Sequence, residues 1–410
     1  MEPLFFSLSG GIVVCARGHR RTAEGSCIVM DGLKGSLPLP SAASRMQVMG
    51  DMGAFADRVL GEIGRARRRV DIECFIVRAD RLGGELARAL TAAAARGVRC
   101  RLLYDPLGCR STDRSYFAAL AARGVEVRRF GWVGALLVGR LLNRPAARNH
   151  ARVIVVDDAA YTGGHAWGDE WWPAARGGDG WHDVCCGVEG AIVEDFATLF
   201  ERHWSQSTAA YPIGDYLGEP RDGVRLVSDA PVKQSVILGR YLEAIAAARR
   251  RVWLANAYFF PPPLLRDALL AAGARGVDVK IIVPGISDVP IIQYAAEAHY
   301  GRWMAAGLEL WEYQGVVMHS KYALVDDDWC LIGTFNANVA SVAFAIEVAV
   351  VSHRASDAAA VAAQLQQDLA ASSRVDGARL QAIPLRRRIL GRLAAFLMSL
   401  ANVLFRRRAA

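Results

Sequence analysis

Lysine is the residue that this sequence almost lacks. Of its 49 basic residues only four are lysines, and all the others are arginines. One of the four, Lys321, follows two positions after His319. Arginine and lysine are not interchangeable where a compact, point-like cation is needed. A lysine retained beside a histidine in so arginine-rich a chain therefore indicates a site of chemistry.

The eight cysteines include no Cys-x-x-Cys pair, so the sequence predicts no structural zinc site and no framework of paired thiols. Five of them lie in or beside apolar runs, where cysteine behaves as a small buried hydrophobic residue. These are Cys74, Cys100, Cys185, Cys186 and Cys330. We therefore expect a reducing, cytoplasm-facing environment.

Long apolar runs are also missing. No segment reaches about 18 uninterrupted apolar residues, so the sequence predicts no membrane-spanning helix. The first residues carry neither a basic n-region nor a clear cleavage site, which argues against a signal peptide. Residues 1–45 contain glycine, serine and proline without a sustained period, and we interpret them as a loose extension.

What the chain does have is a sizeable apolar fraction and a positive charge. Its 410 residues are 53% hydrophobic and 22% charged, a balance that excludes a disordered chain and suggests two domains or one double-lobed unit. The net charge of +8 favours an anionic partner: a phospholipid surface, a nucleic acid or a phosphorylated substrate.

The sequence repeats itself over about 150 residues. Residues 66–105 and 248–285 both pass from "ARRRV" through an apolar strand, an Ala/Leu-rich helix and a glycine stop into a second apolar strand. A further helix and then a histidine follow in each half. A repeat of this length predicts two α/β lobes related by a pseudo-twofold axis, each a mixed sheet flanked by helices. The expected boundaries are 46–208 and 224–372 for the lobes, 209–223 for the linker and 384–410 for a C-terminal helix.

The second half carries the more complete cluster of polar residues. His319 and Lys321 are two apart and so face the same side of a predicted strand that ends at Asp326. A turn with hydroxyl and amide donors follows, and its residues are Gly333, Thr334 and Asn336. Such a set suits a phosphoryl group: the lysine neutralises its oxygens, the donors bind it, and the imidazole attacks or protonates.

The first half repeats this spacing with His150, Arg152 and Asp157, followed by Gly163 and Gly164. Two histidines at equivalent positions are what in-line phosphoryl transfer uses. One attacks phosphorus, and the other protonates the leaving oxygen. Because cationic side chains can carry the charge, the pattern requires neither a metal ion nor a cofactor.

The duplicated H-x-K-x4-D pattern with G-[ST]-x-N resembles the phospholipase D superfamily over residues 45–351. The segments "RNH", "GDEW", "WHD", "NAYFFP" and "HSKYALVDDDWCLIGTFN" are most similar to bacterial cardiolipin synthases of the phospholipase D type. The resemblance implies transfer of a phosphatidyl group through a histidine adduct to an alcohol. It places catalytic or binding roles on His150, Asp157, His319, Lys321, Asp326, Thr334 and Asn336. By family habit His150 is the nucleophile and His319 the general acid, although spacing alone leaves the two interchangeable.

Two carboxylates complete the predicted site. Asp183 follows His150 by 33 residues and Glu347 follows His319 by 28, and each is expected to orient an imidazole. The first half departs from the family pattern, because Arg152 replaces the lysine and Ala166 stands where an asparagine is expected. The second half has Thr334 where serine is common and Ala345 where asparagine often stands.

The C-terminus brackets 17 mostly apolar residues between Arg386–Arg388 and Arg406–Arg408. This pattern is typical of a helix lying in the headgroup region of an anionic membrane. The apolar, basic insertion at 130–148 is a second candidate lipid-facing surface or a buried helix. We therefore expect a peripheral or monotopic protein on the cytoplasmic side of the cell membrane, bound to anionic phospholipids. The sequence gives no oligomeric state.

Two alternatives remain open at this point. A hydrolase or nuclease of the same superfamily would share the motifs, and a basic chain suits DNA as well as lipid. The apolar insertion, "NAYFFP" and the arginine-bracketed tail argue against a nucleic-acid partner. The second alternative is a lipid-binding protein whose first motif no longer supports catalysis.

Overall fold

The computed structural model describes residues 43–131, 148–207, 214–230 and 235–409, with side chains up to residue 400. The predicted extension at 1–45 and the insertion at 130–148 therefore fall almost wholly outside the described residues. So do the side chains of Arg406–Arg408. Residues 41–410 form one compact unit.

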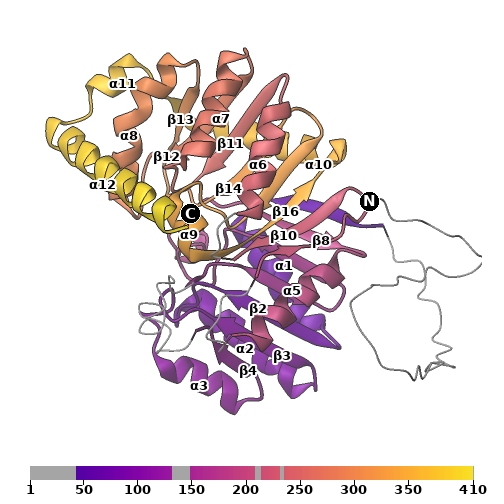
Figure 1. Ribbon diagram of the computed structural model, residues 1–410. Coiled ribbons are helices and arrows are strands. Elements are labelled where there is room, and N and C mark those ends of the chain that lie inside the picture. Colours follow the sequence, from indigo (N-terminus) through magenta and orange to yellow (C-terminus); the bar gives the residue numbers. More distant parts are fainter. Residues whose placement is uncertain (1–42, 132–147, 208–213, 231–234, 410) are drawn as a thin grey trace, which may run out of the picture. The chain divides into compact units, whose positions relative to one another are not determined.

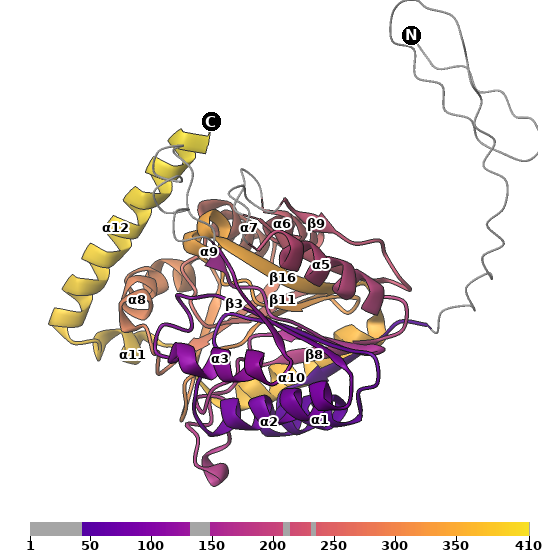
Figure 2. The same ribbon diagram turned by 90° about the horizontal axis from the view of Figure 1, so that it is seen from below.

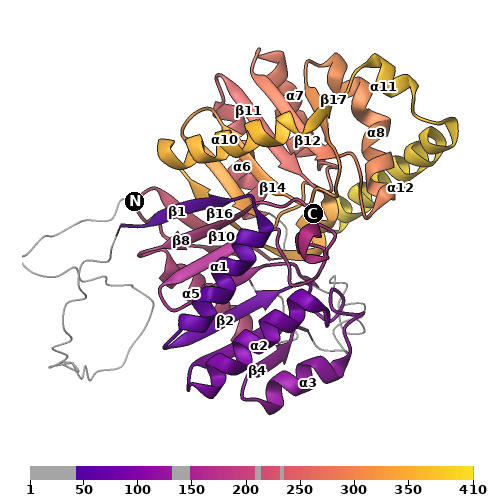
Figure 3. The same ribbon diagram turned by 180° about the vertical axis from the view of Figure 1, so that it is seen from behind.

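The first lobe is built on a seven-stranded mixed sheet with the strand order β1-β8-β7-β6-β2-β3-β4. Its central strands β2 and β3 are parallel, and the other neighbours on the β1 side pair antiparallel. The bounds are β1 Arg45–Met49, β2 Arg69–Cys74, β3 Arg99–Tyr104, β4 Glu126–Arg129, β6 Val153–Val156, β7 Ala159–Gly163 and β8 Cys185–Glu189. The helices α1 Met52–Arg65, α2 Arg81–Ala95 and α3 Arg114–Ala122 cover its outer face, as Figures 1 and 3 show.

The second lobe repeats this order with one strand added at each edge. Its sheet runs β17-β13-β12-β11-β14-β15-β16-β10-β9, and the short β5 Arg148–Asn149 joins β16 from the other half. The strands are β9 Tyr216–Leu217, β10 Val224–Asp229, β11 Arg251–Asn256, β12 Asp278–Pro284, β13 Glu309–Tyr313, β14 Lys321–Val325, β15 Trp329–Gly333, β16 Ala345–Ser352 and β17 Ser372–Arg374. The outer helices are α6 Val236–Ala247, α7 Pro263–Ala274 and α8 Pro290–Ala305. The two lobes predicted from the sequence are thus present, and Tyr216–Leu217 of the expected linker form the edge strand β9.

The two sheets meet at a seam filled by one shared apolar core. The inward faces of both sheets contribute to it, and so do α5 Val193–Ser205 and α10 Ala355–Ala370, which lie between the lobes (Figure 1). Each lobe also has a separate apolar cluster of its own, which fills the space between its sheet and its outer helices. Because the largest buried cluster belongs to neither lobe alone, burying it fixes the two halves against one another. The five cysteines expected to be buried are buried and free.

The two "ARRRV" segments are held in the same way in the two lobes. Asp157 adopts φ +47° in the turn after β6, and its carboxylate accepts hydrogen bonds from the backbone N–H groups of Arg67, Arg68 and Arg69 at 2.8–3.0 Å. Asp326 does the same at φ +50°, accepting from the N–H groups of residues 249–251. Each aspartate therefore ties the turn after a motif strand to the start of the strand beside it.

The C-terminal helix expected over 384–410 is α12, Leu385–Ala409, and it packs along α8 (Figure 2). A short helix, α11 Gly377–Gln381, leads into it. Among the described residues, no helix combines the length and the hydropathy needed to cross a membrane.

We predict that Asp326→Asn lowers the free energy of unfolding by about 1–3 kcal/mol, because three backbone donors lose a charged acceptor. Asparagine tolerates a positive φ, so the change isolates the lost charge. The matched control is Asp328→Asn, two residues away and exposed. Urea unfolding of the three proteins measures the difference. Equal stability of the Asp326 and Asp328 variants would contradict this role.

The pH dependence has a defined sign. Burial alone would raise the pKa of Asp326, but the three backbone hydrogen bonds outweigh it and the pKa is lowered. The stabilisation is therefore present above the unfolded-state pKa near 4 and is lost as the pH falls below it. The difference in free energy of unfolding between the native protein and Asp326→Asn should therefore become smaller over the same pH range.

Candidate active site at the seam of the two lobes

The two histidines occupy equivalent places, each just before a central strand at the seam. The backbone N–H of His150 donates to the carbonyl of Ile346 at 3.0 Å, and that of His319 donates to the carbonyl of His182 at 2.7 Å. His182 also forms a bridge with Met318. In both cases the partner belongs to the opposite half of the sequence, so each histidine is anchored across the seam.

The carboxylates are exchanged between the lobes. Nδ1 of His150 lies 2.9 Å from Oε2 of Glu347, and Nδ1 of His319 lies 2.8 Å from Oδ2 of Asp183. An ionised carboxylate only accepts, so Nδ1–H of His150 donates to Glu347 and its Nε2 keeps the lone pair. Nδ1 of His319 lies against both Asp183 and Nζ of Lys321. The expectation that Glu347 and Asp183 contact imidazoles agrees with this geometry, but each serves the histidine of the other half.

Burial keeps both imidazoles neutral in the free protein. It is the largest cause that lowers the pKa of His150, and it lowers the pKa of His319, together with the charge of Lys321, to about 3. Burial alone would raise the pKa of Asp183, but Lys321 and the hydrogen bonds from His319 and Trp171 lower it to about 2. A neutral imidazole held by an ionised carboxylate is a competent nucleophile through Nε2.

Two cations converge on the histidines. Lys321 is fully buried, with Nζ 2.8 Å from Nδ1 of His319, and burial lowers its pKa to about 7. Arg152 is 3% exposed, and both terminal nitrogens of its guanidinium lie 3.5 Å from Nε2 of His150. The charge of Arg152 also lowers the pKa of His319 and of Lys321. The motif cation of each lobe thus acts on the site of the other lobe.

The residues expected to bind substrate divide into two groups. Asn336 is 6% exposed and its Oδ1 has no hydrogen-bond partner among the described residues, so its amide is not committed to the fold. Thr334 instead donates its hydroxyl to Oε2 of Glu347, the oxygen that holds His150. Thr334 therefore positions the carboxylate in the structure rather than standing free for a ligand.

The two glycines, Gly164 and Gly333, provide space for neighbouring groups rather than contacts to a substrate. A Cβ on Gly164 would lie 2.2 Å from Oδ1 of Asp183, and one on Gly333 would lie 2.3 Å from the carbonyl oxygen of Val348. Gly164 is the counterpart of Thr334 in the repeat, and both contact the carboxylate of their lobe. The close approach explains why glycine is needed at 164.

The departure at Ala166 is filled by aromatic packing. Ala166 is fully buried, and its neighbour His165 contacts the rings of Phe55, Trp167 and Trp171. Burial lowers the pKa of His165 to about 3, and neither of its ring nitrogens has a hydrogen-bond partner in the described part of the chain. The first lobe therefore supplies no amide where the second lobe supplies Asn336.

Asp157 and Asp326 lie at the far ends of their motif strands, roughly 20 Å from the histidines at about 3.3 Å per residue. The sequence pattern already placed Asp326 at a strand end. The role expected for the two aspartates came from the family resemblance and stays a prediction. Both carboxylates are bound by backbone N–H groups at the opposite ends of the strands from the histidines.

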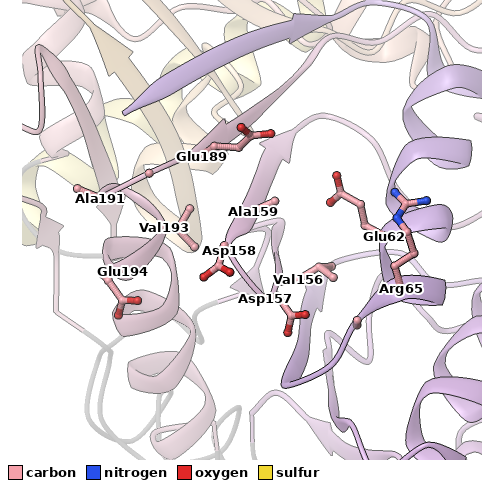
Figure 4. Close-up of a pocket in the computed structure, with 12 residues that line it drawn as sticks. Glu62, Arg65, Val156, Asp157, Asp158, Ala159, Glu189, Ala191, Val193 and Glu194 are labelled. Atoms are coloured by element: carbon pink, nitrogen blue, oxygen red, sulfur yellow. The ribbon is translucent and has the colours of Figure 1, made fainter. Parts of the chain in front are cut away.

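A cavity of about 620 Å³ lies at that opposite edge, lined in part by Asp157 (Figure 4). Four further acidic residues surround it: Glu62, Asp158, Glu189 and Glu194. So acidic a lining repels a phosphate, so this cavity does not compete with the seam as the site for an anionic substrate. Among the described residues, no group of three or more His, Cys, Asp or Glu side chains is placed to hold a metal ion.

Sequence reasoning missed the residues that support the histidines. Trp171 donates from Nε1 to Asp183 at 3.0 Å. The rings of Phe75 and Tyr258 lie 5.0 and 5.7 Å from those of His150 and His319. The motifs "GDEW" and "NAYFFP" contain Trp171 and Tyr258, so the signal was present, but nothing in it shows which side chain turns inward.

A buried polar network also fixes the segment before His150. The backbone N–H of Asn149 donates to Asp105 at 2.9 Å, and its side-chain amide donates to Glu73, which is itself 2.7 Å from Nδ1 of His203. Glu73 belongs to β2, a strand interpreted from the sequence as simply apolar. Buried acids survive there because each has polar partners.

Comparison with known proteins identifies the family. The sequence pattern of the family described as "Cardiolipin synthase, PLD-like domain" matches residues 59–204 and 241–370, one stretch in each lobe. The chain belongs to the phospholipase D-like cardiolipin synthase family. A cardiolipin synthase of Geobacillus kaustophilus (strain HTA426) is 30% identical over 358 residues, which cover 85% of this chain and 71% of the relative. Cardiolipin synthase 2 of Bacillus cereus is 30% identical over 341 residues, 81% of this chain and 66% of the relative.

Solved structures of this type share the fold. The phosphatidylserine synthase of Haemophilus influenzae Rd KW20 superimposes with a TM-score of 0.69 over 90% of this chain and 97% of its own, at 13% identity. At that identity the similarity establishes the fold alone. The prediction of two tandem phospholipase D-like lobes is therefore confirmed by both the family match and the structural neighbour.

We predict that Glu347→Gln lowers kcat on phospholipid vesicles by about 10²–10⁴-fold and changes KM little. An amide cannot stabilise the charge that develops on His150. It also no longer fixes which ring nitrogen of His150 carries the proton. The matched control is Glu243→Gln, whose side chain is 61% exposed. Steady-state turnover measures the effect. A Glu347→Gln protein with a third or more of native turnover would contradict the role.

Proposed function

We propose that the protein is a phosphatidyltransferase that makes cardiolipin, or a closely related phospholipid, through a phosphohistidine intermediate. One observation supports this more than any other. Two histidines are held crosswise through Nδ1 by buried carboxylates, each with a cation from its own motif beside it. The cardiolipin synthase relatives supply the substrate class.

The first half-reaction forms a phosphorus–nitrogen bond. Nε2 of the nucleophilic histidine attacks the phosphorus of a phosphatidylglycerol donor, and the bond from phosphorus to the glycerol oxygen breaks. The second histidine, protonated, gives its proton to that oxygen, and glycerol leaves. The bound phosphate is itself an anion, so it raises the pKa of a nearby imidazole and supplies the acid form that burial otherwise disfavours.

The second half-reaction reverses the roles. An acceptor hydroxyl, from a second phosphatidylglycerol, attacks the phosphohistidine and passes its proton to the second histidine. The phosphorus–nitrogen bond breaks, and the product is a lipid with two phosphatidyl groups. Lys321 and Arg152 balance the charge of the phosphate oxygens throughout, and the free amide of Asn336 donates to one of them.

We assign His150 as the nucleophile and His319 as the general acid. His150 is the more accessible of the two, with a side chain 13% exposed against 4% for His319. Its Nε2 faces the guanidinium of Arg152, where a phosphate oxygen would bind. Asp183 completes the pair by keeping an ionised carboxylate against His319, which favours the protonated form once the phosphate is bound.

The place of action follows from the substrates. The protein acts on phospholipids at a membrane surface, and we propose a peripheral or monotopic attachment on the cytoplasmic side. Hydrolysis is the competing outcome of the same chemistry, since water can replace the acceptor hydroxyl. A nuclease of the same superfamily would use the same histidines on a phosphodiester of DNA.

Purified protein should convert phosphatidylglycerol vesicles into cardiolipin with release of one glycerol for each cardiolipin formed. His150→Ala and His319→Ala should each lower this rate by about 10³-fold or more. His353→Ala is the control, because His353 is exposed and follows the far end of β16, the strand that carries Glu347 near its start. Thin-layer chromatography of the lipids measures the result. Phosphatidic acid as sole product would identify a hydrolase, cleaved plasmid DNA a nuclease, and unchanged lipid a binding protein.

The nucleophile is tested separately. With labelled phosphatidylglycerol supplied below the enzyme concentration and the reaction quenched rapidly, the phosphatidyl adduct should be found on His150. Mass spectrometry of peptides prepared at alkaline pH, where phosphohistidine survives, locates it. An adduct on His319 would reverse the assignment while leaving the transfer chemistry in place.

A further inference from the structure

The large apolar side chains that are exposed do not scatter over the molecule. Apart from Leu217, those found among the described residues lie either on α12 or in the segments that follow β3, β11 and β12. They are Leu107 and Ile286 in loops, Leu264 and Ile291 in the first turns of α7 and α8, and Leu385, Ile389, Leu390, Leu393, Phe396, Leu397 and Leu400 on α12. So many large apolar side chains exposed on one helix mark an interaction site rather than ordinary surface composition.

The helix α12 is apolar on two opposite faces. Its small residues face inward: Ala394 and Ala395 pack with Phe260 and Ala295. Gly391 also belongs to this side, since a Cβ there would lie 2.2 Å from the carbonyl oxygen of a residue on α8. At 100° per residue the seven large exposed side chains span an arc of about 140° on the opposite face. The helix therefore buries its small residues and presents its large ones.

Ion pairs hold α12 in this orientation. Arg387, in its first turn, binds Glu297 of α8 with Nε at 2.7 Å from Oε2. Glu297 is 7% exposed and also pairs with Arg379, which bridges to Glu312 of β13 at 2.8 Å. Because buried partners fix the helix, the exposed arc is a constant feature of this surface.

The exposed residues that follow β12 are connected to the active site. The hydroxyl of Tyr258 donates to Asp288 at 2.8 Å, and the ring of Tyr258 lies 5.7 Å from that of His319. Ile286 and Ile291, 52% and 48% exposed, flank Asp288 in sequence. Asp288, which lies between Ile286 and Ile291 in the sequence, thus connects these exposed residues to Tyr258 and through its ring to His319.

The charge of α12 identifies the occupant. The helix contains no acidic residue. Arg386 and Arg392 are exposed, and neither makes an ion pair with a described residue. Large apolar side chains with unpaired arginines at their border match an anionic bilayer, in which the side chains enter the acyl boundary and the arginines contact headgroups.

We propose that the outward arc of α12, together with Leu264, Ile286 and Ile291, is a docking face for an anionic bilayer that sets the active-site edge against the lipid surface. This rests on the proposed function, since it supplies the route by which a lipid headgroup reaches the histidines without leaving the membrane. The docking face binds the bilayer at its surface, and this contact does not require a segment that crosses the membrane.

The test is co-sedimentation of the full chain with vesicles of phosphatidylglycerol and, separately, of phosphatidylcholine. Native protein should bind phosphatidylglycerol vesicles more tightly. The triple variant I389S/L393S/F396S should lose about 10-fold or more in binding, and Arg386→Gln and Arg392→Gln about 5-fold each. Ile286→Ser with Ile291→Ser should also weaken binding. Leu217→Ser, at a large exposed apolar residue outside the face, should bind as native protein does.

Thermal unfolding shows whether each variant folds, and the variant at Ile286 and Ile291 keeps the test valid if the α12 variant does not. Native-like binding by both folded variants would overturn the proposal. So would loss of a dimer by the triple variant with vesicle binding unchanged, because a second copy would then be the occupant. His150→Ala should bind vesicles as native protein does, so failure of the proposed chemistry and failure of docking give different results.

Discussion

The structure depends on one exchange: each motif histidine receives its carboxylate from the other half of the chain. His150 is paired with Glu347, and His319 with Asp183. Neither lobe alone supplies the carboxylate that contacts its own motif histidine. The shared apolar core at the seam therefore positions the candidate site as well as stabilising the fold, since a shift between the sheets would break both pairs together.

The same exchange explains how so much charge is buried at the seam. Lys321 and Arg152 are almost fully excluded from water, a state that costs more than a lone ion pair returns. Two buried carboxylates offset this cost, and an anionic substrate completes the balance. The arrangement is pre-organised for a phosphate, because the cations and the free amide of Asn336 do not have to move when the phosphate binds. Lysine is retained at 321 because a compact ammonium fits between His319 and the ring of Tyr258.

Much of the fold and part of the site could be predicted from the sequence. The two halves share their order of apolar strands and glycine stops, and the strand orders of the two sheets match accordingly. The histidines and their cations follow from spacing alone. The crosswise pairing does not, because its partners are 197 and 136 residues apart and only the packing of the lobes brings them together. Asp157 and Asp326 entered the predicted set through the family resemblance, and spacing alone does not show that their carboxylates bind backbone N–H groups of the neighbouring segment. Ala166 correctly marked a difference between the two lobes. The aromatic rings that pack around its neighbour His165 could not be predicted from the local sequence.

The exchange is tested most directly by nitrogen-15 NMR of the imidazole side chains in the free protein. With Glu347→Gln, the ring nitrogens of His150 should shift and those of His319 should keep their native positions, while Asp183→Asn should do the reverse. If each carboxylate instead perturbed the histidine of its own half, the lobes would be self-contained and this account of the site would be wrong.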